Sequence, residues 1–371
     1  MTPAPPTHQT RTNDHAARSR RRVQTVPRMA VGALAATLVI SVSACTEKRH
    51  ASGKGASSAV KPSAVKLALV PGGPHPYFQP WKAAGEQAKA DFGLGAVTFN
   101  ETAGWDQTKQ NNILNSLEAQ GYNAFGIFGV SPDNINSTFS DLARKHIYVA
   151  SLASCPAGTT DAAAFCLSTD VETAAYKAAK AAIAAMGGTG NLVHLTGNKT
   201  DSNTQRRIAG VQKAVVETGG KVKLIQTITD IDKDLQTAQK AVADLLAAKG
   251  KQINAIVTTA YNPAVAAAAG VNQAHLPIKI VAIDDDKTIL SDISDGRVSA
   301  TVVQNPVGQA YVGAYALMKL AGGCTMNDPG VVIDSGSFVV TKDNVQSYDT
   351  QRQAKTTELK SDFDSKYLSC S

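Results

Sequence analysis

The chain has 371 residues, of which 43% are apolar and 18% charged, so it is long enough for two folded domains and not typical of a disordered protein. Its formal net charge is +7, but residues 1–44 alone carry +5, from six arginines and one aspartate. The rest of the chain therefore carries only +2, which gives no electrostatic footprint for a phosphate backbone and excludes nucleic acid as the expected partner.

The N-terminus has the pattern of an export signal. A basic segment around Arg18–Arg22 precedes an apolar run, Met29–Ile40, and the small residues Val42-Ser-Ala precede Cys45. The run is shorter than the ~20 residues that span a bilayer, which favours a cleaved signal peptide over residues 1–44. Val-Ser-Ala-Cys resembles the lipobox of bacterial lipoproteins, and this resemblance implies that the Cys45 sulfur is lipidated; an ordinary signal peptide is the alternative.

Residues 45–64 contain Ser, Gly, Ala and Lys with almost nothing to bury, so we expect a flexible tether after the lipid anchor. Anchor, tether and folded body together predict an exported protein, held by lipid at the outer face of the cytoplasmic membrane.

From Val65 onward, short apolar runs alternate with longer amphipathic runs, which predict buried strands and helices respectively. The predicted strands are Val65–Val70, Val97–Asn100, Ala124–Phe128, Tyr148–Leu152, Asn191–Leu195, Val222–Ile228, Ala255–Thr259, Ile278–Ile283 and Val298–Val303. The predicted helices include Trp81–Asp91, Gln107–Gln120, Ile135–Lys145, Val171–Met186, Thr204–Glu217 and Leu235–Lys249. Such alternation is typical of parallel sheets covered by helices. Because it is too long for one compact sheet, we expect an α/β fold with two lobes.

Four cysteines remain after Cys45, an even number that favours two disulfides in an exported protein. Three pairings are open. Cys155 with Cys166 closes the shortest loop, and Cys324 with Cys370 would then tie the C-terminal tail to the body. Zinc is disfavoured because no Cys-x-x-Cys spacing occurs, and we expect neither a metal nor a cofactor.

Motifs for catalysis are missing from the sequence. It contains no Gly-x-Ser-x-Gly elbow and no Gly-x-x-x-x-Gly-Lys phosphate loop, and Gly187-Gly-Thr-Gly190 precedes a predicted strand instead of following one. Asp284–Asp286 lacks the spacing of a calcium loop. We therefore expect a binding protein and not an enzyme.

Polar and aromatic residues gather where predicted strands end, which is where open α/β sheets present groups to ligands. Such groups describe a pocket for a small polar ligand. The candidate ligand-binding residues are His75, Tyr77, Phe78, Thr169, Asp170, Asn198, Arg207, Asn262, Asp284 and Gln304. Trp105 is either a further wall of this pocket or an ordinary packing residue.

Several segments resemble the type I periplasmic sugar-binding proteins of bacterial ABC importers, in the ribose, galactose and rhamnose branch. The resemblance runs from about Val65 to Val345 and is strong only because the segments occur in the family's order. They are Leu69-Val-Pro-Gly-Gly-Pro-His-Pro-Tyr-Phe78, Gly121-Tyr-Asn-Ala, Asn203-Thr-Gln-Arg-Arg-Ile-Ala-Gly-Val-Gln, Val281-Ala-Ile-Asp284, Asp295-Gly-Arg-Val-Ser-Ala-Thr-Val-Val-Gln304-Asn-Pro and Val340-Thr-Lys-Asp-Asn344.

This resemblance implies two Rossmann-like lobes that are joined by a three-segment hinge and close on the ligand. The implied N-terminal lobe is 65–167 plus 305–334, and the C-terminal lobe is 168–304 plus 335–345, with 346–371 as a tail. By position, His75 matches a hydrogen-bonding residue of the family, and Tyr77 with Phe78 matches its aromatic pair. Arg207, Asp284 and Gln304 match its arginine, aspartate and hinge glutamine.

The sequence also departs from the family's pattern. Ala153-Ser154 stands where ribose-type members have an Asp-Arg pair, and Ala260-Tyr261 replaces an Asn-Asp pair. Ribose and glucose are therefore disfavoured as ligands. The resemblance implies a monomer that delivers a sugar or similar small polar ligand to ABC permease subunits; the alternative is a lipoprotein that presents a sugar or an autoinducer-like molecule to a membrane receptor.

Overall fold

The computed structural model describes residues 59–156 and 162–370. The predicted signal peptide, Cys45 and most of the predicted tether therefore lie outside the described residues. Within the described ranges, no helix is both long and apolar enough to cross a membrane.

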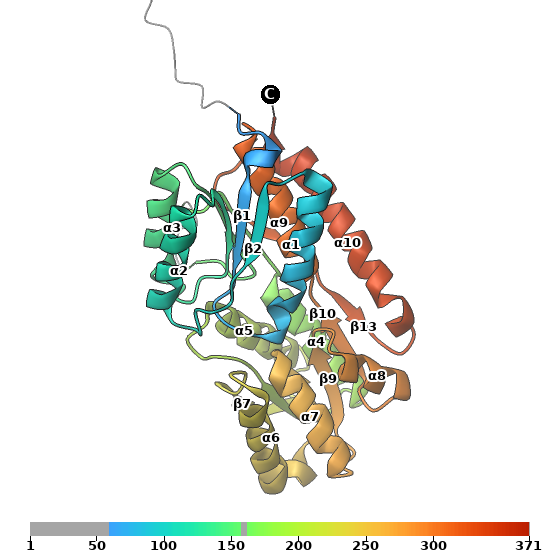
Figure 1. Cartoon of the computed structure of the whole chain (residues 1–371). Helices are drawn as coiled ribbons and strands as arrows, with labels where there is room; N and C mark the ends of the chain where they lie inside the picture. The colour runs from blue at the N-terminus through green and yellow to red at the C-terminus, as the bar shows by residue number, and fades with distance from the viewer. Residues whose placement is uncertain (1–58, 157–161, 371) are drawn as a thin grey trace, which may run out of the picture. The chain divides into compact units, whose positions relative to one another are not determined.

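Two six-stranded sheets organise the body (Figure 1). The first has the order β12-β5-β4-β3-β1-β2, and its paired strands all run parallel. Its strands are β1 (Lys66–Val70), β2 (Ala96–Phe99), β3 (Ala124–Ile127), β4 (Tyr148–Leu152), β5 (Phe165–Ser168) and β12 (Val331–Asp334). The prediction of parallel sheets covered by helices is confirmed.

The second sheet has the order β13-β10-β9-β8-β6-β7 and is parallel except for the edge strand β13. Its strands are β6 (Gly190–Leu195), β7 (Val222–Ile228), β8 (Ala255–Thr258), β9 (Lys279–Ile283), β10 (Ala300–Val303) and β13 (Phe338–Val340). A short antiparallel pair, β11 (Thr325–Met326) and β14 (Leu368–Ser369), lies apart from both sheets.

Helices cover both faces of each sheet. The helices of the first sheet are α1 (Gln79–Phe92), α2 (Gln107–Ala119), α3 (Ile135–Arg144), α9 (Pro306–Ala321) and α10 (Tyr348–Asp362). Those of the second sheet are α4 (Val171–Ala185), α5 (Ser202–Val216), α6 (Leu235–Lys249), α7 (Tyr261–Gln273) and α8 (Lys287–Asp295). Figure 1 shows α1 and α9 side by side, and these two helices are in contact.

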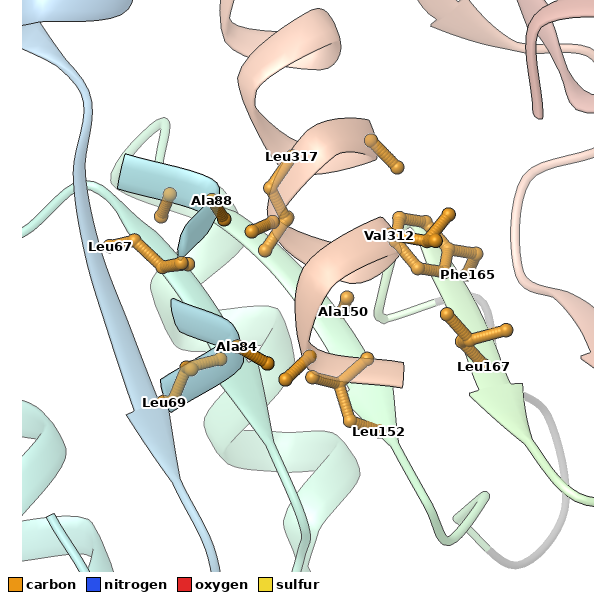
Figure 2. Packing of buried hydrophobic residues seen from close by; sticks show 14 of the residues in the cluster. Leu67, Leu69, Ala84, Ala88, Ala150, Leu152, Phe165, Leu167, Val312 and Leu317 are labelled. Atoms are coloured by element: carbon orange, nitrogen blue, oxygen red, sulfur yellow. The ribbon is translucent and has the colours of Figure 1, made fainter. Parts of the chain in front are cut away.

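The core of each sheet follows the two-residue period of a strand. In β1, Leu67 and Leu69 face the cluster beneath α1 and α9, whereas Ala68 and Val70 face the cluster beneath α2 and α3. Figure 2 shows Leu67 and Leu69 beside Ala84 and Ala88 of α1, with Leu317 of α9 close by. Strands buried on both faces need continuous apolar runs, which is why they could be read from the sequence.

Helix starts are marked by aspartates that accept hydrogen bonds from backbone N–H groups. Asp106, Asp170, Asp201, Asp234 and Asp286 cap α2, α4, α5, α6 and α8 in this way. A cap of this kind stabilises a helix by about 1 kcal/mol. Because the helices begin just after strand ends, the same caps fix the loops that surround the carboxyl edges of the sheets.

The chain passes between the two sheets three times, after β5, after β10 and after β12. These crossings are hydrogen-bonded to one another. The Ser335 N–H donates to the Ser168 carbonyl at 2.8 Å, and the Gln309 side chain donates to the Ser335 hydroxyl at 3.0 Å. Asn305 also donates to the Ser335 carbonyl, at 3.3 Å. The three crossings thus form one polar cluster.

The structure contains two disulfides, Cys155–Cys166 and Cys324–Cys370. The second holds the end of the chain beside the start of β11. The tail preceding it packs on the first sheet's core, where Leu359, Phe363 and Leu368 are buried. The sequence left the role of this tail open; the structure makes it part of the first sheet's hydrophobic core.

Candidate ligand-binding site

A cavity of about 470 Å³ lies at the carboxyl ends of strands from both sheets. This volume falls within the range of about 300–1,000 Å³ that is usual for small-molecule sites. The first sheet contributes one wall, made of His75, Tyr77, Phe78, Gly104, Trp105, Phe128, Val130 and Ala153. The second sheet contributes the other, made of Gly197, Asn198, Asp201, Asn203, Arg207, Asp230, Asp232, Lys233, Ala260, Tyr261, Asp284 and Gln304.

Asp284 is the first residue after β9, and it is only 6% exposed. Its backbone has φ +66°, a left-handed conformation that costs energy for a residue other than glycine. The surrounding structure holds it there: the Asp284 N–H donates to the Val302 carbonyl at 2.9 Å, and the Thr301 hydroxyl donates to the Asp284 carbonyl at 2.7 Å. These two hydrogen bonds hold the backbone of Asp284 in place and so fix the direction of its carboxyl group.

Burial, together with the nearby charge of Asp285, raises the pKa of Asp284 to about 7. The Gln304 side chain opposes this shift by donating to Asp284 Oδ1 at 2.7 Å, and the charge of Arg207 opposes it as well. The carboxyl group therefore changes its charge near neutral pH. It is placed to hydrogen-bond a ligand hydroxyl as donor or as acceptor.

Arg207 extends from α5, whose N-terminal end borders the cavity. Its Nε is buried and has no hydrogen-bond partner among the described residues. A buried guanidinium donor without a partner is costly in a native protein, so such a group commonly meets a bound ligand or water. Asp201, which caps α5, lies close enough for the Arg207 charge to lower its pKa, although burial raises it overall.

His75 stands opposite this polar wall. Its Nδ1 accepts from the Tyr77 N–H at 3.2 Å, and its Nε2 lies 3.3 Å from Asp232 Oδ2 on the second sheet's side. That second contact has an ion-pair distance but not the geometry of a hydrogen bond. His75 therefore faces an acidic group across the cavity.

Aromatic rings form the rest of the first wall. Phe78 and Phe128 meet edge to face with centroids 5.1 Å apart, and Trp105 lies 6.0 Å from Phe128 and 6.3 Å from Phe78. The Tyr77 hydroxyl donates to Gln309 at 2.9 Å, and burial raises the pKa of that hydroxyl. Tyr77 thus links the cavity to the cluster of crossing segments.

The structure brings most of the predicted site residues together. Those that line the cavity are His75, Tyr77, Phe78, Trp105, Asn198, Arg207, Asp284 and Gln304. Most come from segments that follow different strands, and Arg207 comes from α5; the meeting of strand ends from two sheets is what makes them neighbours.

Three predicted residues do not line the cavity. The Thr169 hydroxyl lies 3.3 Å from the Ser335 hydroxyl, within the crossing cluster. Asp170 caps α4 and lies 3.4 Å from Arg206. Asn262 uses its side chain to donate to the Asp232 carbonyl at 3.0 Å. Thr169 and Asp170 directly follow β5, and Asn262 lies in the first turn of α7; the side chains of all three hydrogen-bond to other residues of the protein.

Other residues of the second wall were not predicted as site residues. Asp230, Asp232 and Lys233 follow β7, and Tyr261 follows β8 and donates to Asp286 at 2.9 Å. The strand-end rule that selected Asp284 could have found them as well. Asn203 lies deeper and donates to the Ala153 carbonyl of the first wall at 3.1 Å, a contact for which the sequence holds no signal.

No group of three or more histidine, cysteine, aspartate or glutamate side chains in the described part of the chain is arranged to hold a metal ion. The chemistry available in the cavity is hydrogen bonding from charged and amide groups on one side, together with ring contacts on the other.

Comparison with solved structures shows the same fold. A solute-binding protein of an ABC transporter from Burkholderia graminis, in complex with D-arabinose, is 23% identical with a TM-score of 0.70, covering 76% of this chain and 97% of that one. One from Actinobacillus succinogenes, with bound D-allose, is 19% identical with a TM-score of 0.69, covering 76% and 100%. A sugar-binding protein from Bacillus halodurans is 20% identical with a TM-score of 0.68, covering 76% and 99%.

No curated protein sequence matches the chain significantly. A family model described as a periplasmic binding protein domain does match it, over residues 68–324. This match covers well over half of the chain, and it agrees with the resemblance found in the sequence. The chain belongs to the periplasmic binding protein family.

Proposed function

We propose that this protein is an extracytoplasmic solute-binding protein that delivers a sugar, or a similar small polar ligand, to an ABC importer. The observation that carries the proposal is the cavity, where Arg207, Asp284 and Gln304 face a wall of aromatic rings. Charged partners make strong hydrogen bonds to hydroxyl groups, and ring faces suit the C–H face of a sugar. The solved structures of the same fold include proteins in complex with D-arabinose and D-allose.

The proposal includes a site, a division into lobes and a location. The ligand contacts His75, Tyr77, Phe78, Trp105, Asn198, Arg207, Asp284 and Gln304. The lobes are 65–167 plus 305–334 and 168–304 plus 335–345, and they close on the ligand about the three crossing segments. Lipid on Cys45 anchors the protein at the outer face of the cytoplasmic membrane, where it acts as a monomer. It binds without catalysing a reaction.

Thermal unfolding of the purified protein against a panel of sugars and polyols tests the binding proposal. A ligand at a hundred times its Kd stabilises the folded state by about 2.7 kcal/mol, so a true ligand raises the melting temperature by several degrees. We expect such a rise with at least one sugar, and we expect Arg207→Ala to abolish it. Val216→Ala is the matched control, because Val216 is 76% exposed and does not line the cavity.

A panel in which no sugar or polyol raises the melting temperature would contradict the proposal. So would a rise that Arg207→Ala leaves intact, because the ligand would then be bound elsewhere.

A further inference from the structure

The two walls of the cavity differ in the number of polar side chains, whereas a free sugar carries hydroxyl groups on all sides. On the second wall, Arg207, Lys233 and Asn198 accompany the acidic side chains. On the first wall, the only polar side-chain groups are the His75 ring, the Tyr77 hydroxyl and the indole N–H of Trp105. Ala153, directly after β4, adds no polar side chain to this wall.

Most polar atoms of the first wall are already engaged. The Tyr77 hydroxyl donates to Gln309, and His75 Nδ1 accepts from the Tyr77 N–H, whereas His75 Nε2 lies 3.3 Å from Asp232 without the geometry of a hydrogen bond. The carbonyl of Ala153 accepts from Asn203 at 3.1 Å, and that of Phe128 accepts from Gln110 at 2.7 Å. Apart from His75 Nε2 and the Trp105 N–H, the side chains of this wall offer a ligand mainly aromatic and aliphatic surface.

Trp105 is the feature that this wall leaves unexplained. It is 42% exposed, and it is the one aromatic residue among the exposed large apolar side chains of the described residues. Its rings meet those of His75, Phe78 and Phe128 at interplanar angles of 81°, 45° and 88°, so none of them stacks flat on the indole. An exposed indole inside a cavity is a surface that a ligand can cover.

The backbone is built to hold that indole in place. Trp105 has φ +63°, an unusual conformation for a bulky residue, and its N–H donates to the Gly72 carbonyl at 2.7 Å. The indole lies against Gly72 and Gly73, where a β-carbon on Gly73 would come within 2.8 Å of Trp105 Nε1. The strained backbone and the close contact with two glycines together indicate that the indole is held in one position.

A free sugar carries hydroxyl groups around its whole rim. Placed here, it would satisfy those that face Arg207, Asp284 and Gln304, and it would leave those that face the first wall beyond the reach of His75 and the Trp105 N–H buried without partners. Each such hydroxyl weakens binding by roughly tenfold to a hundredfold. A ligand without hydroxyls on that side avoids this loss.

Resting on the proposed function, we propose that the ligand is a sugar bearing a flat apolar group, as in an aryl glycoside. The sugar part hydrogen-bonds to Arg207, Asp284 and Gln304, and the flat group lies on the indole of Trp105. The single-sided polarity of the cavity and the exposed, fixed indole are then two parts of one binding surface.

Calorimetric titration of matched pairs tests this inference. The probes are the methyl and phenyl glycosides, in both anomeric forms, of D-glucose, D-galactose, D-xylose and L-arabinose, together with the free sugars. Ring stacking and burial of the phenyl group predict that, for at least one sugar, the phenyl glycoside binds about tenfold more tightly than its methyl partner.

Variants show which residue provides the additional affinity for the phenyl glycoside. Trp105→Ala is expected to reduce the phenyl-to-methyl affinity ratio to less than about threefold, and Trp105→Phe to retain an intermediate ratio. Arg207→Lys, which keeps the charge but not the guanidinium, is expected to weaken both members of a pair by a similar factor and so to preserve the ratio. Val216→Ala controls for surface substitution, and circular dichroism checks that each variant is folded.

The inference is overturned if methyl glycosides or free sugars bind as tightly as phenyl glycosides, or if the ratio survives Trp105→Ala. In both cases sugar binding itself stands. If no free sugar and neither kind of glycoside binds, the proposed function fails together with the inference.

Discussion

Asp284 connects backbone strain, burial and charge in one residue. Because burial raises its pKa to about 7, the folded protein keeps this carboxyl protonated at pH values where the unfolded chain has lost the proton. Between about pH 4 and pH 7 the folded state therefore binds more protons than the unfolded state. By linkage, the contribution of Asp284 to the free energy of unfolding falls as the pH rises through this window, and it stays low above it.

Asp284→Asn removes the titrating group while keeping an amide that can still meet Gln304. We therefore expect the variant to gain stability relative to the wild type as the pH rises from 4 to 7, with a constant difference above that. Chemical denaturation at pH 4, 5.5, 7 and 8.5 measures this. A difference between the two proteins that does not change with pH would contradict the shifted pKa.

The sequence indicated the type and place of Asp284, but not its environment. Its position after an apolar strand was visible, whereas its left-handed backbone and its burial depend on Val302, Thr301 and Gln304 of the neighbouring strand and loop. Thr169 shows the opposite case. It follows a strand in the same way, yet its hydroxyl lies in the crossing cluster, because a one-dimensional pattern does not say which way a strand-end side chain turns.

At the scale of elements, α4 and α5 pack so closely that a side chain is excluded between them. A β-carbon on Gly210 of α5 would clash with the backbone carbonyl oxygen of Glu172 in α4, and it would lie 3.0 Å from the Tyr176 nitrogen. Glycine inside a helix normally costs about 1 kcal/mol relative to alanine, so the close approach must outweigh that preference here.

Gly210→Ala is therefore expected to lower the free energy of unfolding by about 2 kcal/mol, since overpacking against rigid backbone costs about 1–3 kcal/mol. Gly270→Ala in α7 is the matched control, because its β-carbon would meet only side-chain atoms, of Val242 and Leu246, which can move. Denaturant titration of both variants measures the difference. Equal stability of the two variants would show that α4 and α5 can separate without cost.

Two strands have the same bounds in the structure as in the prediction. Tyr148–Leu152 is a central and almost wholly buried strand, whereas Val222–Ile228 is the half-buried edge strand β7. Short edge strands such as β12 and β13 were missed. They are mostly apolar but only four and three residues long, too short for a clear pattern of their own, and their pairing with β5 and β10 defines them as strands.

At the scale of the whole molecule, the two disulfides close loops of very different length. Cys324–Cys370 closes a loop of 46 residues and Cys155–Cys166 one of 11. In the chain-entropy account, closing these loops stabilises the folded state by about 4 and about 3 kcal/mol respectively. We expect the Cys324→Ala/Cys370→Ala double variant to lose about 4 kcal/mol of unfolding free energy, measured by denaturant titration.

The Cys155→Ala/Cys166→Ala double variant and the reduced wild type provide the comparison, the latter expected to lose at least as much as either variant. A loss below about 1 kcal/mol in the first variant would contradict this prediction. It would mean that the packing of Leu359, Phe363 and Leu368 holds the tail without help from the disulfide.

The two-sheet architecture could be predicted from the sequence because alternating strands and helices leave few other solutions. The cavity could be predicted only in outline. Asp284 and Gln304 directly follow recognisable strands, but the contact of Asn203 with Ala153 and the exposure of Trp105 depend on how loops from both sheets meet. Such meetings are set by tertiary packing, for which local pattern carries no signal.

The central claim is that the cavity between the carboxyl ends of the two sheets binds a sugar. The most direct test is calorimetric titration, against the full chain, of the sugar or glycoside that raises the melting temperature most. We predict saturable one-to-one binding by the wild type and by Val216→Ala, and no measurable binding by Arg207→Ala. Undiminished binding by a folded Arg207→Ala protein would contradict the account.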